Sequence, residues 1–436
     1  MTKLNILVLH RLGDPCAWRE SMVEKELCLP KFAPEHNYFV HDFWLPMPSH
    51  MKNMDYDAIV LTQTFLGCRL DGGMRARIES EYGELLRGLS FKIALPQDDY
   101  TCSGILDRWL CDWNVDLVYP VCSNNWEVLY PLYSKVGRLK QGFTGYINEE
   151  LVARTENFRL VGARTVDVAY RAANLRPEFG RLGQIKVEYG DRFLKAVSGL
   201  SLNNDISTRP QDVVLGERWY DFIENTRCML GVNSGSSLLD PEGSISEHVY
   251  RYLQRRPSAS FEEVEAVCFP GQEGQYEFTA ISPRNLECAL FGAVQILAPG
   301  AYSGFLQPWE HYIPLEPDMS NISEVIPLLS DHAFLQAMAY RCRAAVLSFP
   351  ELRYRGHAAE LINEIKGNTR LSDSARAKNA PVIEFHQREL VKKIPDYWRK
   401  KRLMTKARQA LGDIGLRRLK YWLKDQMAEQ MAKMNS

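Results

Sequence analysis

Three polar residues at the start of one predicted helix have the types and spacing to bind a phosphorylated, hydroxyl-bearing ligand. Ser282, Pro283 and Arg284 open the segment, and Glu287 follows one turn later. Pro283 suits a first helical turn, whose unpaired backbone N–H groups attract anions. The Arg284 guanidinium offers paired donors to phosphate oxygens, and the Glu287 carboxylate accepts two hydroxyl hydrogen bonds at once, as a ribose supplies them. A surface ion pair between Arg284 and Glu287 is the alternative.

A short strand is predicted directly after this helix. Gly292 is placed to end the helix, the mostly apolar residues 293–297 follow, and a Pro-Gly pair stops the strand. Ligands on α/β sheets lie beyond the carboxyl ends of the strands. This places Tyr302, Ser303 and Gly304 at a ligand edge, where their backbone N–H groups are predicted to meet a diphosphate. A plain β-turn explains the Ser-Gly pair equally well.

Two further places along the chain are predicted to contribute polar groups to the same ligand. Residues 228–232 read as a strand that ends in a small polar loop containing Ser234 and Gly235, a turn that lets backbone N–H groups approach a ligand. His311 precedes another strand-like run and is also a candidate. A structural histidine with its hydrogen bonds satisfied inside the fold is the more frequent case for a lone His.

The pattern Arg-x-x-Glu on a short helix, followed by a glycine turn, a hydrophobic strand and a loop, resembles the donor-binding element of retaining glycosyltransferases of the GT-B fold. In the commoner members two glutamates lie eight positions apart; Glu287 matches the second, and Thr279 stands in place of the first. The chain is more similar to bacterial glycosyltransferases of the spore-coat and surface-polysaccharide type, whose donor helix begins Ser-Pro-Arg. This similarity covers residues 219–347 and implies a nucleoside-diphosphate sugar as co-substrate, without a cofactor.

Alternating strand and helix patterns predict two Rossmann-like α/β domains that face each other across a cleft, the GT-B arrangement. The first domain is predicted over residues 1–185 and begins with the strand-like run 4–10. The second, nucleotide-sugar-binding domain is predicted over residues 186–375, with its first strand at 196–202.

Candidates for the general base, or for positioning the acceptor, come from the first domain. His10 and Asp14 follow its first predicted strand, and Asp98 and Asp99 follow a later one. A carboxylate at the carboxyl end of a parallel strand is well placed for proton transfer. No Asp-x-Asp pair stands after a strand as a metal site requires, so the reaction is expected to be metal-independent.

Composition sets further limits. The chain has 436 residues, more than a single core usually accommodates, and its net charge of −1 argues against a nucleic-acid partner. Its 10 cysteines have no metal-ligand spacing and indicate reduced thiols in a cytoplasmic protein. No stretch approaches the roughly 20 apolar residues that a membrane span needs.

The last predicted segment, residues 376–436, is a basic helical tail. Lysines and arginines alternate there with apolar residues such as Trp398, Leu411 and Trp422, which indicates a basic amphipathic helix. Such a helix binds anionic membrane surfaces, which fits an enzyme that acts on a lipid-linked acceptor at the inner face of the plasma membrane. A solvated or core-packed terminal helix is the alternative.

These observations predict a cytoplasmic glycosyltransferase of the hexosyltransferase type, peripheral on the membrane. It would move a sugar from a nucleoside diphosphate to a glycan or lipid-linked acceptor in surface-polysaccharide or lipopolysaccharide synthesis. One alternative is a nucleotide-sugar epimerase with the same donor pocket. The other is a catalytically silent GT-B-like module that binds a polysaccharide assembly complex through its basic tail.

Overall fold

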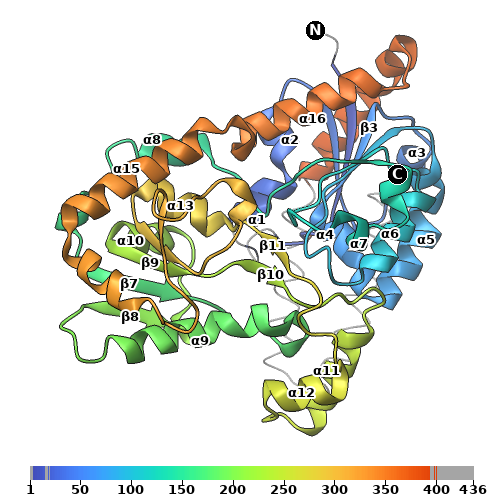
Figure 1. The fold of residues 1–436 in the computed structure, drawn as a ribbon. Coiled ribbons are helices and arrows are strands. Elements are labelled where there is room, and N and C mark those ends of the chain that lie inside the picture. Colours follow the sequence, from blue (N-terminus) through green and yellow to red (C-terminus); the bar gives the residue numbers. More distant parts are fainter. Residues whose placement is uncertain (1–2, 15–17, 19, 393–396, 398, 400–436) are drawn as a thin grey trace.

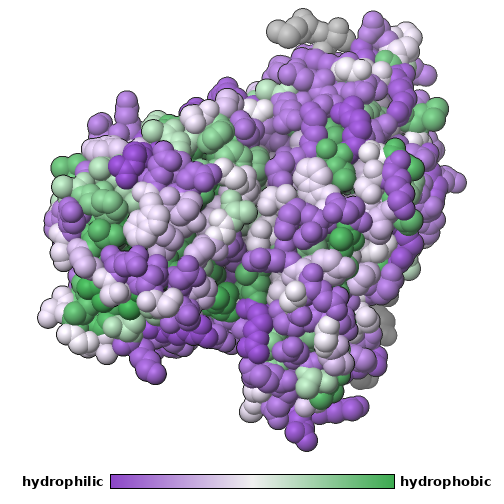
Figure 2. Space-filling view, in the orientation of Figure 1, coloured by the Kyte–Doolittle hydropathy of each residue, from purple (hydrophilic) through white to green (hydrophobic). Residues whose placement is uncertain are grey.

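The chain folds around two parallel β-sheets that lie side by side (Figure 1). The computed structural model describes residues 3–14, 18, 20–392, 397 and 399. The first sheet has six strands in the order β2-β1-β3-β4-β5-β6, and the second has five in the order β13-β12-β9-β7-β8. Every strand pair in both sheets is parallel. The predicted pair of Rossmann-like α/β domains is confirmed. Figure 2 shows a recess between the two lobes in the lower half of the view.

The first domain alternates strands and helices along the chain. Its strands are β1 (Asn5–His10), β2 (Asn37–Asp42), β3 (Ala58–Leu61), β4 (Phe91–Ala94), β5 (Leu117–Val118) and β6 (Arg138–Leu139). Its helices are α1 (Glu20–Glu26), α2 (Cys28–Phe32), α3 (Ser49–Lys52), α4 (Gln63–Leu66), α5 (Gly72–Arg87), α6 (Ser103–Asp112) and α7 (Trp126–Leu129), with 3-10 turns η2 (Gly67–Leu70) and η3 (Tyr133–Lys135).

The first strand of this domain, β1, is buried on both faces. Ile6 and Val8 of β1 pack into one apolar cluster with α2, and Leu7 and Leu9 pack into a second cluster with α5 and α6. Because successive side chains of a strand point to opposite faces, a strand between two helical layers is apolar at every position. The continuous apolar run in the sequence therefore predicts this strand correctly.

The second domain follows the same plan. Its strands are β7 (Val166–Arg171), β8 (Asn204–Ser207), β9 (Thr226–Gly231), β12 (Val294–Leu297) and β13 (Tyr312–Pro314). Its helices are α8 (Glu149–Arg154), α9 (Gly180–Ala196), α10 (Glu217–Glu224), α13 (Pro283–Phe291), α14 (Ile322–Val325) and α15 (His332–Ser348). Its 3-10 turns are η4 (Val161–Ala163), η5 (Pro177–Phe179), η6 (Pro210–Asp212), η7 (Tyr302–Gly304) and η8 (Ile326–Ser330).

The boundary predicted at residue 185 is wrong, because it falls inside α9, and β7 before it already pairs with β8 and β9 of the second sheet. The strand predicted at 196–202 is also wrong, because α9 extends to Ala196 and the next strand, β8, begins at Asn204. The glycines of α9 obscure a helix in the sequence, since glycine weakens helix interiors. At Gly190 a Cβ would lie 3.1 Å from both Tyr170 and Ile206, so glycine lets α9 pack closely on the sheet.

A small antiparallel ribbon lies between the two domains. It consists of β10 (Ser234–Ser236) and β11 (Phe278–Ala280), and the chain between them forms α11 (Ser244–Arg255) and α12 (Phe261–Cys268), which project at the bottom of Figure 1. The first domain holds this insertion through backbone hydrogen bonds, from Cys102 N to Asp240 O at 2.6 Å and from Ser123 N to Thr279 O at 3.0 Å.

The chain returns to the first domain after α15. Helix α16 (Tyr354–Asn368), which follows the 3-10 turn η9 (Pro350–Leu352), continues along the top of Figure 1 and contacts α2. Residues 373–392 are helical, and Arg376 forms an ion pair at 2.8 Å with the fully buried Asp57. The start of the predicted tail is therefore attached to the first domain. Most of the basic segment lies outside the described residues, and its membrane role stays a prediction.

The nine cysteines of the described residues are all free, and only Cys111 is not buried. No helix in the described part of the chain is long and apolar enough to cross a membrane.

Candidate functional site

The start of α13 is fixed to the second sheet by buried amides. Both the backbone N–H and the hydroxyl of Ser282 donate to Asn285 Oδ1 at 3.0 Å. The Asn285 amide in turn donates to Gln295 Oε1 on β12 at 2.8 Å, and Gln295 Nε2 donates back to Asn285 O at 3.1 Å. Buried polar groups paired in this way hold the helix N-terminus in one position. Ser282 therefore positions the helix.

Glu287 and Arg284 lie against one aromatic residue from α10. The indole N–H of Trp219 donates to Glu287 Oε2 at 2.7 Å. The Arg284 guanidinium lies 5.2 Å from the centre of the Trp219 ring and 6.0 Å from that of Tyr170. Aromatic faces attract cations, so these rings hold the guanidinium at the start of α13. The structure thus places both predicted residues in one oriented, partly exposed group.

A second cation, Lys186 of α9, lies close enough to Arg284 for their charges to interact. Burial and, to a smaller extent, the positive charge of Arg284 lower the pKa of Lys186 to about 8, against the negative charge of Asp98, which raises it. Asp98 belongs to the first domain, whereas Lys186 and Arg284 belong to the second. Lys186 therefore interacts electrostatically with a cation of its own domain and with a carboxylate of the other, and these three charges define the site.

The neighbours Asp98 and Asp99 have different surroundings. Asp98 is exposed, has a left-handed backbone (φ 51°) after β4, and accepts a hydrogen bond from the Tyr100 hydroxyl at 3.0 Å. Asp99 is fully buried, accepts a hydrogen bond from Val121 N at 3.2 Å, and burial raises its pKa to about 6. Of the two predicted catalytic aspartates, only Asp98 is exposed to a ligand.

The two remaining catalytic candidates follow β1. His10 is buried, and its Nδ1 accepts a hydrogen bond from Leu12 N at 3.2 Å. Burial lowers the pKa of His10 to about 4, so the ring is neutral at pH 7 and closes the turn after β1. Asp14 is partly exposed, at the end of the described stretch 3–14.

The turn after β12 braces the start of α13 from within the second domain. Tyr302 is buried and its hydroxyl donates to Ala298 O at 2.6 Å, while Gly304 N donates to Ala301 O at 2.7 Å. The Ser303 hydroxyl accepts from Ile281 N at 3.1 Å, directly before α13. The two hydroxyls and the Gly304 N–H are therefore engaged within the protein, and the role predicted for the Tyr302 and Ser303 N–H groups stays a prediction.

Ser234 and Gly235 were predicted to lie in a loop after a strand, but they form the strand β10. Gly235 has φ 140°, and a Cβ there would lie 1.7 Å from Phe278 O, so glycine is required by the close approach of β11. Thr279, which stands in place of the first glutamate of the resembling family, is buried in β11 opposite Gly235. Residues 234–235 position the segment that leads into α13.

His311 lies in the loop before β13, away from this group. Its Nδ1 accepts a hydrogen bond from Gln307 N at 3.0 Å, and burial lowers its pKa. This geometry is that of a structural histidine, the alternative given for His311. Within the described part of the chain, no cluster of three or more His, Cys, Asp or Glu side chains could hold a metal ion.

Sequence reasoning missed two residues of the site. Lys186 has no motif around it, and α9 itself was not predicted. Trp219 lies on α10, and only the folded chain brings its indole to Glu287, 68 positions away. The sequence could have indicated Lys186 only through a helical pattern beginning at Gly180, because that helix carries Lys186 in its second turn.

The two parallel α/β domains and the site between them define the class of protein: it has the GT-B architecture. A search of solved structures found an α-glucosyltransferase in complex with UDP and a 13-mer DNA, at 9% identity over 84% of this chain and 100% of that chain, with a TM-score of 0.49. Anabaena HepE in complex with UDP-glucose gave 11% identity over 83% and 100% of the two chains, with a TM-score of 0.44. Sucrose-phosphate synthase from Thermosynechococcus elongatus gave 12% identity over 84% and 99%, with a TM-score of 0.44.

No family model matches the chain, and no curated protein matches it. At identities of 9–12%, what this chain does has to be inferred from its own residues.

Proposed function

We propose that this protein transfers a sugar from a nucleoside diphosphate to a glycan or lipid-linked surface-polysaccharide acceptor, without a cofactor and without a metal ion. The observation that carries the proposal is that Lys186 interacts both with the second cation, Arg284, and with the exposed carboxylate of Asp98 from the first domain. A diphosphate needs paired positive charge, and the hydroxyl of an acceptor needs a base on the other side of the anomeric carbon.

The donor contacts come from the second domain. Arg284 and Lys186 bind the diphosphate, and their charges stabilise the negative charge that develops on it as the sugar leaves. Glu287, oriented by the Trp219 indole at 2.7 Å, accepts the ribose hydroxyls. Two cations in one place supply the positive charge that a divalent ion provides in other sites, which supports metal independence.

The acceptor is activated from the first domain. Asp98 takes the proton of the acceptor hydroxyl while the acceptor oxygen bonds to the anomeric carbon. The bond from that carbon to the phosphate oxygen breaks, and the nucleoside diphosphate leaves with the electron pair. The left-handed backbone of Asp98 and its bond from the Tyr100 hydroxyl at 3.0 Å orient the exposed carboxylate. Strained backbone of this kind persists where the surrounding structure fixes it, often at functional sites.

The cellular context follows from the sequence of the tail. The basic residues after Arg388 support attachment to an anionic inner leaflet, and so an acceptor that is anchored in lipid. We place the protein in the cytoplasm, peripheral on the membrane, and assign it no nucleic-acid partner, in line with its net charge of −1.

A thermal-shift screen against UDP, GDP, dTDP, ADP and CMP, each with its common sugar conjugates, tests this function. A ligand that binds only the folded state raises the melting temperature in proportion to ln(1 + [L]/Kd). We expect one nucleotide family to raise it in the wild type and to do so less in Arg284→Met. If none of the five families raises the melting temperature, the proposed activity is refuted and the alternative of a catalytically silent binding module is favoured.

A further inference from the structure

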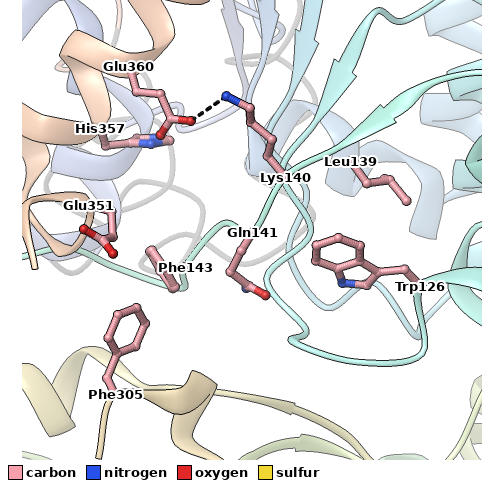
Figure 3. Close-up of a pocket in the computed structure, with 9 residues that line it drawn as sticks. All are labelled: Trp126, Leu139, Lys140, Gln141, Phe143, Phe305, Glu351, His357 and Glu360. Atoms are coloured by element: carbon pink, nitrogen blue, oxygen red, sulfur yellow. Dashed lines mark hydrogen bonds and ion pairs between the residues drawn. The ribbon is translucent and has the colours of Figure 1, made fainter.

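A cavity of about 450 Å³ lies where the two domains join (Figure 3), and Arg284, Lys186 and Glu287 are not among the residues that line it. Lys140, Gln141 and Phe143 reach it from the stretch that carries the chain from β6 into the second domain. Glu351 and Glu360 reach it from the stretch that returns the chain through η9 and α16 to the first domain. Both crossings between the domains therefore line one cavity, of a size typical of small-ligand sites.

Aromatic side chains form its apolar walls. Trp126 comes from α7 of the first domain, and its indole N–H is bonded to Cys122 O at 2.7 Å, which fixes the plane of the ring. Phe305 comes from the turn after η7 in the second domain and meets Phe143 edge to face, with ring centres 5.3 Å apart. The electron-rich faces of such rings attract the weakly positive C–H groups of a sugar ring.

The polar groups of the cavity are mainly acceptors. Glu351 is exposed, and Glu360 accepts from Lys140 Nζ at 3.0 Å and from the Tyr119 hydroxyl at 3.1 Å through one oxygen, Oε1. Gln141 directs its Nε2 to backbone carbonyl groups of the protein, among them Pro120 O at 3.3 Å. In Figure 3 its amide oxygen points toward Trp126, while Glu351 and Glu360 face the cavity from the opposite side.

The charge of the cavity excludes phosphates. The single lysine, Lys140, is bound to two carboxylates, Glu360 at 3.0 Å and Glu364 at 2.7 Å. The other basic group is His357, which burial keeps neutral by lowering its pKa to about 3. Glu364 is also paired with Arg138. With Glu351 added, three carboxylates outnumber two cations, so the surroundings carry net negative charge and offer acceptors to a ligand rich in hydroxyl donors. A nucleotide would be repelled.

We propose that this cavity is a second carbohydrate site, which binds a neutral saccharide unit between aromatic walls and carboxylate acceptors at the junction of the domains. It does not rest on the proposed transfer reaction, because none of its residues belongs to the donor site. A saccharide bound there contacts both chain crossings, so its binding depends on the relative placement of the two domains.

The test uses the full-length, nucleotide-free protein and the disaccharides maltose, cellobiose and lactose, with binding measured by saturation-transfer NMR and titration calorimetry. We expect at least one of them to bind, and Phe305→Ala and Glu351→Gln each to weaken it about tenfold, the scale of one lost contact. The variant Glu217→Gln serves as the matched control, because Glu217 is an exposed glutamate paired with Arg154 at 2.6 Å and does not line the cavity, so disaccharide affinity should stay unchanged.

Three results would overturn this proposal: no binding of any of the three sugars, binding by Phe305→Ala and Glu351→Gln as tight as that of the wild type, or loss of binding in Glu217→Gln. Binding of tetramethylammonium in their place would show a cation site instead. Melting curves check that each variant is folded. Nucleotide binding is also measured for Phe305→Ala, because retained nucleotide affinity shows that the substitution affects the cavity and leaves the donor site intact.

Discussion

Replacing Glu287 with glutamine tests the donor site at its most defined contact. The Trp219 indole N–H donates to Glu287 Oε2 at 2.7 Å, and a glutamine oxygen can accept the same bond, so the local structure should persist. What glutamine loses is the negative charge and one acceptor oxygen. A ribose that shares both oxygens of the carboxylate then loses one charge-assisted hydrogen bond.

The size of the effect follows from that single bond. A hydrogen bond to a charged group contributes about 1.5–3 kcal/mol, which corresponds to a Kd higher by roughly 10- to 150-fold. The ligand is the nucleoside diphosphate that the thermal screen selects, and the assay is titration calorimetry at constant pH. The melting temperature of the free protein should stay near that of the wild type, because Glu287 is only partly buried.

The matched control is Glu217→Gln on α10. Glu217 is an exposed glutamate on α10, paired with Arg154 at 2.6 Å. Ion pairs at the surface contribute little to the free energy of unfolding, so this substitution should leave the fold unchanged. If Glu287→Gln is folded and binds the nucleotide as tightly as the wild type and Glu217→Gln, Glu287 does not bind the ribose and its role at this site is wrong.

Four further predictions test other parts of the structure. Nucleotide affinity should fall as pH rises through about 8, where Lys186 loses its proton, and Lys186→Met should abolish this pH dependence in calorimetry; an unchanged profile would separate Lys186 from the diphosphate. Asp98→Asn should lower the turnover of the nucleotide sugar by about 10²–10⁴-fold at an unchanged melting temperature, and full activity would exclude it as the base. Arg376→Met should cost about 3–5 kcal/mol in urea unfolding, because it leaves the buried Asp57 charge without its ion-pair partner, and a cost near that of a surface pair would refute this. Gly235→Ala should cost more than about 1 kcal/mol by the same measurement, since its Cβ would meet a backbone oxygen at 1.7 Å, and a neutral effect would contradict the close strand approach.

How much the sequence predicts depends on whether a feature is local. The six buried residues of β1 and the helix from Pro283 with its Arg-x-x-Glu spacing are local patterns, and the structure contains both elements. The difference between Asp98 and Asp99 is not local in this sense. Both follow the same strand. In the structure Asp98 has a left-handed backbone and is exposed, whereas Asp99 is fully buried, and this difference has no counterpart in the sequence pattern.

Residues 234–235 illustrate the same limit. A Ser-Gly pair after a strand suits a ligand loop, and sequence gives no sign that Ser234 will pair with Ala280 across the insertion of α11 and α12. Pairing over such a distance is decided by the tertiary fold, and it converts a predicted binding loop into a support for α13. The insertion itself contains two helices, α11 and α12.

The support that β10 and β11 provide bears on how the two halves of the site meet. The start of α13 is held from both sides: Ser303 bonds Ile281 N at 3.1 Å from within the second domain, and Thr144 of the first crossing bonds Ile281 O at 2.6 Å. The ribbon is also bonded to the first domain through Ser123 N. Because these bonds surround the helix that carries Arg284, the distance between the cations and Asp98 is set by contacts at the site itself. Changes in the ribbon should therefore alter turnover through geometry, even where no ligand contact is lost.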